Sequence, residues 1–72
     1  MWKKIVLNGF YIEAKVYGEG SKFGINGGKI SKLWIAKEKH LFLNYDRGWD
    51  VELDTQNSEL VEVYNKVLEM WN

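Results

Sequence analysis

The spacing of apolar residues changes once along this chain of 72 residues. Up to Leu53, short runs alternate between apolar and polar side chains, which is the period of two that β-strands have. From about Asn57 or Ser58 onward, apolar residues recur instead at helical spacing. The sequence therefore predicts an α+β fold in which the strands come first and a single helix comes last.

The strongest turn signal is Asn8-Gly9, which separates two β-rich runs near the start of the chain. This dipeptide is typical of a two-residue type I′ hairpin turn. A turn of that length fixes the register, so Leu7 is expected opposite Phe10, and Lys4 opposite Glu13. The face with Leu7 and Phe10 is the more apolar one and should face the core.

The other face of this hairpin carries more apolar side chains than a fully solvated face would. Its members are Trp2, Lys4, Val6, Tyr11, Glu13, Lys15 and Tyr17. A row of aromatic residues on one face suggests a partner, and a second copy of the chain is the simplest one. We therefore expect a homo-oligomer. Docking on a different protein through this aromatic face is the alternative.

Three further strands are expected after a glycine-rich stretch. They cover residues 29–36, residues 40–45 and a short run from Trp49 to Leu53. Residues 37–39 form the first connecting turn, and Asp46-Arg47-Gly48 resembles a type I turn with its glycine at the left-handed position. Connections this short favour antiparallel neighbours. On the predicted third strand, Ser31, Leu33 and Ile35 share one side, whereas Ile30, Lys32, Trp34 and Ala36 share the other.

The final segment predicts one amphipathic helix, because its apolar residues form a single stripe. They are Leu60, Val63, Tyr64, Val67, Leu68 and Trp71. Thr55, Asn57 and Ser58 offer N-cap oxygens. The expected fold is a small antiparallel sheet of four to five strands (β-β-loop-β-β-β) with one C-terminal helix packed on one face, in a single domain covering residues 1–72.

The composition restricts the chemistry of the chain. It has no cysteine and one histidine, so disulfides, thiolate metal sites and histidine-based zinc sites are not expected. His40 lacks the partners that acid-base catalysis needs, and no Ser/His/acid arrangement is present. The sequence therefore predicts a protein that is not an enzyme and needs no metal or cofactor. The short apolar run Ile5–Leu7 is no targeting or membrane segment, which predicts a cytoplasmic protein.

The charges are distributed unevenly, although the net charge is zero. Residues 1–40 hold eight lysines and three acids, whereas residues 41–72 hold two bases and seven acids. Either the two parts pair in the folded domain, or the lysine-rich part presents a basic surface to an anionic partner. A neutral total makes binding of duplex nucleic acid unlikely.

The segment Gly18–Leu33 begins with five glycines in eleven residues. Glycine permits the alternating-handed backbone of an anion-binding nest, so Gly24–Gly28 is a candidate site for phosphate or carboxylate. Nearby side chains would add charge or hydroxyl donors: Ser21, Lys22, Lys29, Ser31 and Lys32. A simple tight turn at Asn26-Gly27-Gly28 is the alternative.

Arg47 is the only arginine and lies between Asp46 and Asp50, close to Trp49. A guanidinium binds phosphate in a fork, and an indole stacks on a base, so these two residues suit a nucleotide. The alternative is a structural pair of Arg47 with one of its acidic neighbours.

Two motifs resemble those of a family of small uncharacterised proteins from phages and mobile elements of Gram-positive bacteria. They are G-S-x-x-G-I-N-G-G-x-I-S-K-L (Gly20–Leu33) and Y-D-R-G-W-D (Tyr45–Asp50). The resemblance implies that the protein works in a host cytoplasm by capturing a host protein or a nucleotide signal of antiviral defence. The site residues that it implies are Ser21, Gly24, Asn26, Gly27, Gly28, Ser31, Lys32, Asp46, Arg47 and Trp49.

The leading hypothesis is a binding protein that holds an anionic, nucleotide-like ligand or an acidic surface at the glycine loop, Arg47 and Trp49. A protein-interaction module that docks through the aromatic sheet face is the second hypothesis. Binding of single-stranded nucleic acid, with rings stacked on bases beside lysines, is the third.

Overall fold

The computed structural model describes residues 1–72 and contains one five-stranded sheet and one helix. The elements in chain order are β1 (Trp2–Leu7), β2 (Phe10–Val16), a short 3-10 turn η1 (Ile25–Gly27), β3 (Ile30–Lys37), β4 (His40–Asp46), β5 (Trp49–Val51) and α1 (Ser58–Trp71). All neighbouring strands are antiparallel, and their order in the sheet is the order in the chain. The predicted α+β fold is confirmed.

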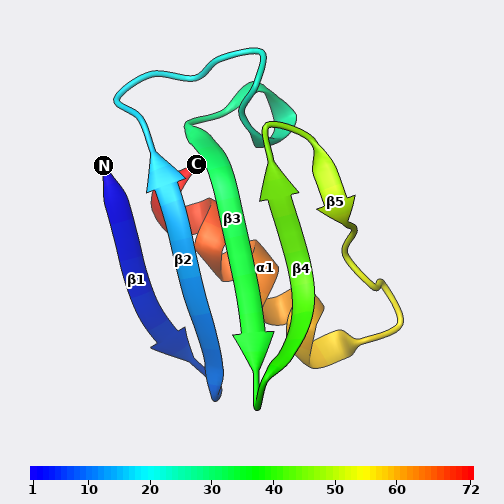
Figure 1. Ribbon diagram of the computed structural model, residues 1–72. Helices are drawn as coiled ribbons and strands as arrows, with labels where there is room; N and C mark the ends of the chain where they lie inside the picture. The colour runs from blue at the N-terminus through cyan, green and yellow to red at the C-terminus, as the bar shows by residue number, and fades with distance from the viewer.

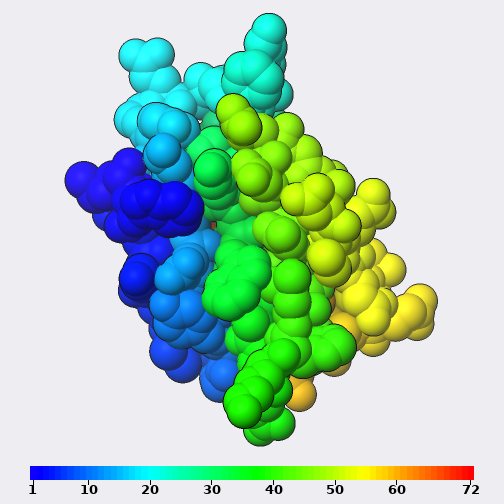
Figure 2. Space-filling model, viewed as in Figure 1, coloured from blue at the N-terminus to red at the C-terminus, as the bar shows by residue number.

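The helix covers one face of the sheet and leaves the other face bare. Figure 1 shows α1 running diagonally behind the sheet, while nothing lies in front of the strands. The thirteen residues of the buried core lie on the helix side: Phe10, Ile12, Ala14, Ile25, Ile30, Leu33, Ile35, Leu43, Tyr45, Leu60, Val63, Tyr64 and Val67. We call the bare side the open face (Figure 2).

The first hairpin has the predicted register, with Leu7 opposite Phe10 and Lys4 opposite Glu13. Asn8 and Gly9 have φ angles of 51° and 82°, as a type I′ turn requires at both central positions. Tyr11 is 39% and Val6 66% exposed on the open face, so the apolar surplus of this face remains in contact with solvent.

Two β-bulges overturn the strict alternation that was expected farther along. Ile30 was expected on the same side as Lys32, but it is fully buried. The register shifts between Lys15 and Val16, so one extra residue of β3 is inserted and Ile30 turns toward the helix. The register shifts a second time beside Ala36. There the extra residue belongs to β4, and Phe42 packs against the core.

The β4–β5 turn differs from its predicted form. Arg47, with φ 56°, occupies the left-handed position that was expected for Gly48. The predicted fifth strand also ends earlier, at Val51. Leu53 leaves the sheet and packs against the core, because the chain must turn under the sheet to reach α1.

The helix begins where the change of period predicts. Asn57 is the N-cap, and its Oδ1 accepts a hydrogen bond of 3.1 Å from the amide of Leu60. The predicted stripe faces the sheet, with Leu60 and Val67 fully buried. The structure has no helix with the length and apolar character that membrane crossing requires.

Candidate functional site

A cleft of about 420 Å³ lies where β2 ends, β3 begins and the chain turns from β4 to β5. Its lining combines three cations, two serines and two aromatic residues: Lys15, Tyr17, Ser21, Phe23, Ser31, Lys32 and Arg47. We call it the basic cleft. Its volume falls within the range of small-molecule sites.

Strand pairing brings the three cations together from separate segments. Lys15 on β2 lies directly opposite Lys32 on β3. The turn that carries Arg47 is held against β3, because the Arg47 amide donates a hydrogen bond of 2.9 Å to the carbonyl of Ser31. Like charges directly opposite each other destabilise a sheet, so the facing lysines cost free energy.

One carboxylate partly balances these cations. Oδ1 of Asp46 lies 3.7 Å from Nζ of Lys32 and 3.7 Å from Nε of Arg47. Pairs this long and this exposed contribute little to stability. Lys15 instead has Nζ 5.9 Å from the ring of Trp2 and 5.5 Å from the ring of Tyr17. The cleft therefore keeps an excess of positive charge.

Ser31 also lines the cleft and is only 3% exposed. Its Oγ is buried and has no hydrogen-bond partner. Most buried polar groups in proteins are paired, because an unpaired one loses its hydration without compensation. Ser31 therefore carries a buried, unpaired hydroxyl in a residue that lines the cleft.

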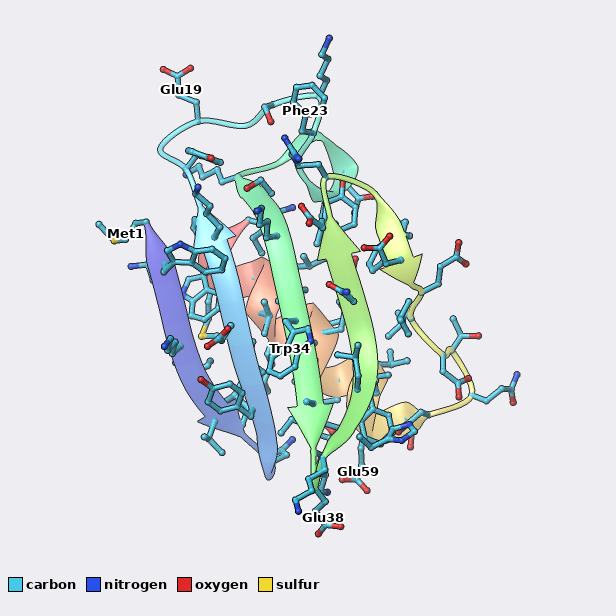
Figure 3. All side chains as sticks on the ribbon, in the orientation of Figure 1. Met1, Glu19, Phe23, Trp34, Glu38 and Glu59 are labelled. Carbon is cyan, nitrogen blue, oxygen red and sulfur yellow. The ribbon has the colours of Figure 1, made fainter.

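The loop above the cleft is tied to the sheet. The hydroxyl of Tyr45 donates a hydrogen bond of 2.8 Å to the carbonyl of Phe23. Oγ of Ser21 accepts a hydrogen bond from the amide of Phe23, and the amide of Ser21 donates to the carbonyl of Gly28. Figure 3 shows Phe23 in this loop, beyond the end of the sheet. The loop is therefore a fixed wall of the cleft.

The expected glycine nest is not available to an anion at three of its five amides. The amides of Gly24, Gly27 and Gly28 donate to the carbonyls of Ser21, Gly24 and Ile25, respectively. An amide that is bonded within the loop does not point at a ligand. The expectation that Gly24–Gly28 presents these amide hydrogens to an anion is therefore wrong.

The glycines have a packing role instead. A Cβ on Gly20 would overlap the carbonyl of Gly27, and a Cβ on Gly24 would overlap that of Gly28. A Cβ on Gly28 would overlap the side chain of Asn72. Close approach of the backbone, for Gly20 and Gly24, or of a side chain, for Gly28, accounts for these three glycines without a ligand.

The structure brings together only some of the site residues expected from the sequence. Ser21, Ser31, Lys32 and Arg47 line the basic cleft, and Asp46 lies beside it. Lys22, Gly24, Asn26, Gly27, Gly28 and Trp49 do not line it. Trp49 instead packs edge to face on Tyr45, with ring centroids 4.9 Å apart, and lines a different hollow with Tyr64.

Sequence analysis did not assign Lys15, Tyr17 and Phe23 to this site. Lys15 and Tyr17 were placed on the aromatic face, which is where they lie, but their proximity to Lys32 depends on how β2 pairs with β3. The sequence does contain both lysines, but only the pairing of β2 with β3 shows that they face each other. Phe23 carried no signal, because its place depends on the path of the loop.

A second hollow of about 300 Å³ lies next to the cleft on the open face. Its lining includes Trp2, Glu13, Lys32, Trp34, Asn44 and Asp46. We call it the tryptophan groove. The hydroxyl of Tyr11 donates a hydrogen bond of 2.8 Å to Oε1 of Glu13, which raises the pKa of Tyr11. Lys32 lines both hollows, so they adjoin.

Comparison with known proteins adds a family but no activity. A family model described as a domain of unknown function, DUF7678, matches residues 1–72. No curated protein and no solved structure matches the chain. No group of three or more His, Asp or Glu side chains is arranged to hold a metal ion.

Proposed function

The chain belongs to the DUF7678 family of domains of unknown function, and we propose that it is a non-enzymatic binding protein that captures an anionic, nucleotide-like ligand in the basic cleft. The observation that carries this proposal is the convergence of Lys15, Lys32 and Arg47 on one cleft. A single carboxylate, Asp46, lies within ion-pair distance of two of them.

Phosphate is the anion that suits this lining best. The guanidinium of Arg47 offers a planar fork of N–H donors, and the two lysines add compact positive charges to the same cleft. The exposed hydroxyl of Ser21 can donate one hydrogen bond to a phosphate oxygen. Tyr17 and Phe23, which are about half exposed, offer ring surface for an organic part of the ligand.

The lining favours capture over chemical conversion. The cleft is lined by no histidine or carboxylate that could serve as a general base, and hydroxyls do not act as nucleophiles without an activating partner. In the setting implied by the resemblance to phage proteins, capture would sequester a nucleotide signal of host defence. That setting stays a prediction.

Calorimetric titration with inorganic pyrophosphate and with linear and cyclic nucleotides tests the proposal. Arg47→Gln and Lys32→Gln should each weaken binding by about tenfold or more, since a charge-assisted hydrogen bond contributes about 1.5–3 kcal/mol. Lys66→Gln makes the same charge change on α1 and should leave the affinity unchanged. Absence of heat with every compound, or equal affinities for all variants, would contradict the proposal.

A second candidate function is docking on a protein partner through the open face. Val6 is 66% and Tyr11 39% exposed at the end of this face away from the cleft. The ring of Tyr11 packs edge to face on Trp34, with centroids 6.0 Å apart, so the aromatic surface is ordered. Val6→Ser combined with Tyr11→Ser should abolish capture of such a partner, whereas Arg47→Ala should leave it intact. The reverse result would reject this candidate.

A further inference from the structure

We propose that the ligand is a guanine nucleotide, with its phosphate in the basic cleft and its base in the tryptophan groove. This inference rests on the proposed function and names the ligand class of that site. It follows from three features of the open face: the spacing of the two hollows, the position of Trp34, and the hydrogen-bonding character of the groove.

The basic cleft and the tryptophan groove lie next to each other along β3, about two residues apart. Lys32 and Trp34 lie two residues apart on β3 and face the same side of the sheet. A strand advances about 3.3 Å per residue, so their Cα atoms lie roughly 6.6 Å apart along β3. On β2, Lys15 and Glu13 repeat this arrangement. A ribose can connect a phosphate held by the two lysines to a base held in the next row.

Trp34 lies at the centre of that next row and offers a surface for stacking. Figure 3 shows Trp34 near the middle of the open face. It pairs with Glu13 on one side and with Asn44 on the other, and its side chain is 38% exposed. A base stacked on an aromatic ring typically gains about 1–3 kcal/mol. Trp2 lines the same groove and adds a second aromatic wall.

The polar groups of the groove are rich in hydrogen-bond acceptors. Glu13 and Asp46 are carboxylates, and Asn44 adds a carbonyl oxygen together with its amide donors. Tyr11 and Lys4 both contact Oε1 of Glu13, at 2.8 Å and 3.4 Å, which orients the carboxylate. Both contacts leave Oε2 available for a ligand.

These acceptors distinguish between bases. Guanine presents two adjacent donors, N1–H and the N2 amino group, from which Oε2 of Glu13 can accept while Oε1 stays bonded to Tyr11. Adenine presents an amino group beside the ring acceptor N1, and a carboxylate repels that acceptor. The carboxylate of Glu13 in this groove also repels phosphate. A nucleotide therefore fits with its phosphate toward Lys15, Lys32 and Arg47 and its base toward Glu13.

Titration of the whole chain with GDP, ADP and pyrophosphate tests the inference, with binding followed by calorimetry. GDP should bind about tenfold more tightly than ADP and than pyrophosphate. Trp34→Leu should weaken GDP binding by about tenfold and leave pyrophosphate binding within about twofold. Glu13→Gln should remove most of the preference for GDP over ADP.

Trp49→Leu is the matched control, since Trp49 is 39% exposed and lies outside both hollows. It should leave the affinity for GDP unchanged. Thermal unfolding of each variant shows whether it is folded. If Trp34→Leu does not fold, Glu13→Gln alone decides the question, because glutamine keeps the size of the side chain and an oxygen that accepts the hydrogen bond from Tyr11.

The outcomes separate this inference from the proposed function. Equal affinities for GDP, ADP and pyrophosphate, with loss of all three in Arg47→Gln, would overturn the guanine assignment and keep the anion site. No binding of any of the three would overturn both. A preference for GDP that Glu13→Gln leaves intact would also overturn the assignment of Glu13 and its groove.

A guanine nucleotide can be free or part of a single strand. Short single-stranded RNAs that differ only by one guanine or adenine distinguish these two sources. Tighter binding of GDP identifies the free nucleotide. Tighter binding of the guanine-containing RNA, falling steeply with salt, identifies the strand. If neither guanine ligand binds better than its adenine counterpart, the inference is wrong.

Discussion

Close packing against neighbouring atoms, and not the binding of an anion, accounts for three glycines in the segment between β2 and β3. Gly24 has φ −78° and ψ 156°, which any residue can adopt. Its lack of a side chain is needed because the carbonyl of Gly28 lies against the position of a Cβ. Gly18, in contrast, has open space around it.

Gly24→Ala should therefore lower the free energy of unfolding by about 2 kcal/mol, as overpacking does. Gly18→Ala is the matched control and should change stability by less than about 0.5 kcal/mol. Urea denaturation followed by tryptophan fluorescence measures both values. Equal effects of the two substitutions would show that the close approach of Gly24 and Gly28 is not required.

Tyr64 makes the stability sensitive to alkaline pH. Burial raises its pKa above the ordinary value of 10.0, and the neighbouring Tyr45 adds to the shift. The folded state thus favours the neutral phenol. Its contribution to stability is fully present below the ordinary pKa and is lost as the pH rises through the raised pKa.

Tyr64→Phe should accordingly lose less stability than the parent between about pH 9 and about pH 11, since no phenol is left to ionise. Tyr17→Phe, at an exposed site, is the control. Thermal unfolding across this pH range gives the comparison. If the unfolding temperatures of the parent and of Tyr64→Phe fall in parallel as the pH rises, the expected role of Tyr64 is contradicted.

Among the elements, α1 depends on a defined start. Its first turn leaves backbone amides without helical partners, and Oδ1 of Asn57 accepts the one from Leu60. The helix contributes four buried residues to the core, Leu60, Val63, Tyr64 and Val67. Loss of its first turn would therefore weaken the sheet packing as well.

Asn57→Ala should destabilise the domain by about 1 kcal/mol through loss of this cap. Asn65→Ala, at an exposed position within α1, should be neutral or slightly stabilising because alanine has the higher helix propensity. Thermal or urea unfolding measures both variants. If Asn57→Ala leaves the free energy of unfolding unchanged, then water satisfies the Leu60 amide as well as Asn57 does.

At the scale of the whole molecule, Asn72 joins the helix to the loop between β2 and β3. Its Oδ1 accepts a hydrogen bond of 3.0 Å from the amide of Ile30, and its Nδ2 donates one of 3.0 Å to the carbonyl of Ile25. These partners are 42 and 47 residues away in the chain. The side chain thus braces the loop that forms one wall of the basic cleft.

Asn72→Ala should reduce the free energy of unfolding by about 1–2 kcal/mol, because two hydrogen bonds are lost. It should also weaken binding of pyrophosphate, since Ser21 and Phe23 lose support. Glu69→Ala, on the exposed side of α1, is the control for a substitution near the end of the helix. A variant that is destabilised yet binds pyrophosphate as the parent does would show that the cleft does not depend on this brace.

The local pattern of the chain was sufficient for most of the fold. Asn8-Gly9 set the register of the first hairpin, and the change of apolar spacing placed the start of α1 within one residue. Both are local effects, determined by turn geometry and by side-chain period. The bulges beside Ile30 and Phe42 were not predictable, because they depend on which side chains the helix accepts across the sheet.

The sequence by itself determined the strand order, the single helix and the presence of one arginine and a row of lysines on the first two-thirds of the chain. Only the tertiary structure decided which of these charges meet. Lys15, Lys32 and Arg47 form one cleft because antiparallel pairing brings distant residues into register, whereas Trp49 is held apart by packing on Tyr45. Local propensity acts over a few residues, but a binding site is built from contacts between segments that only the folded sheet brings together.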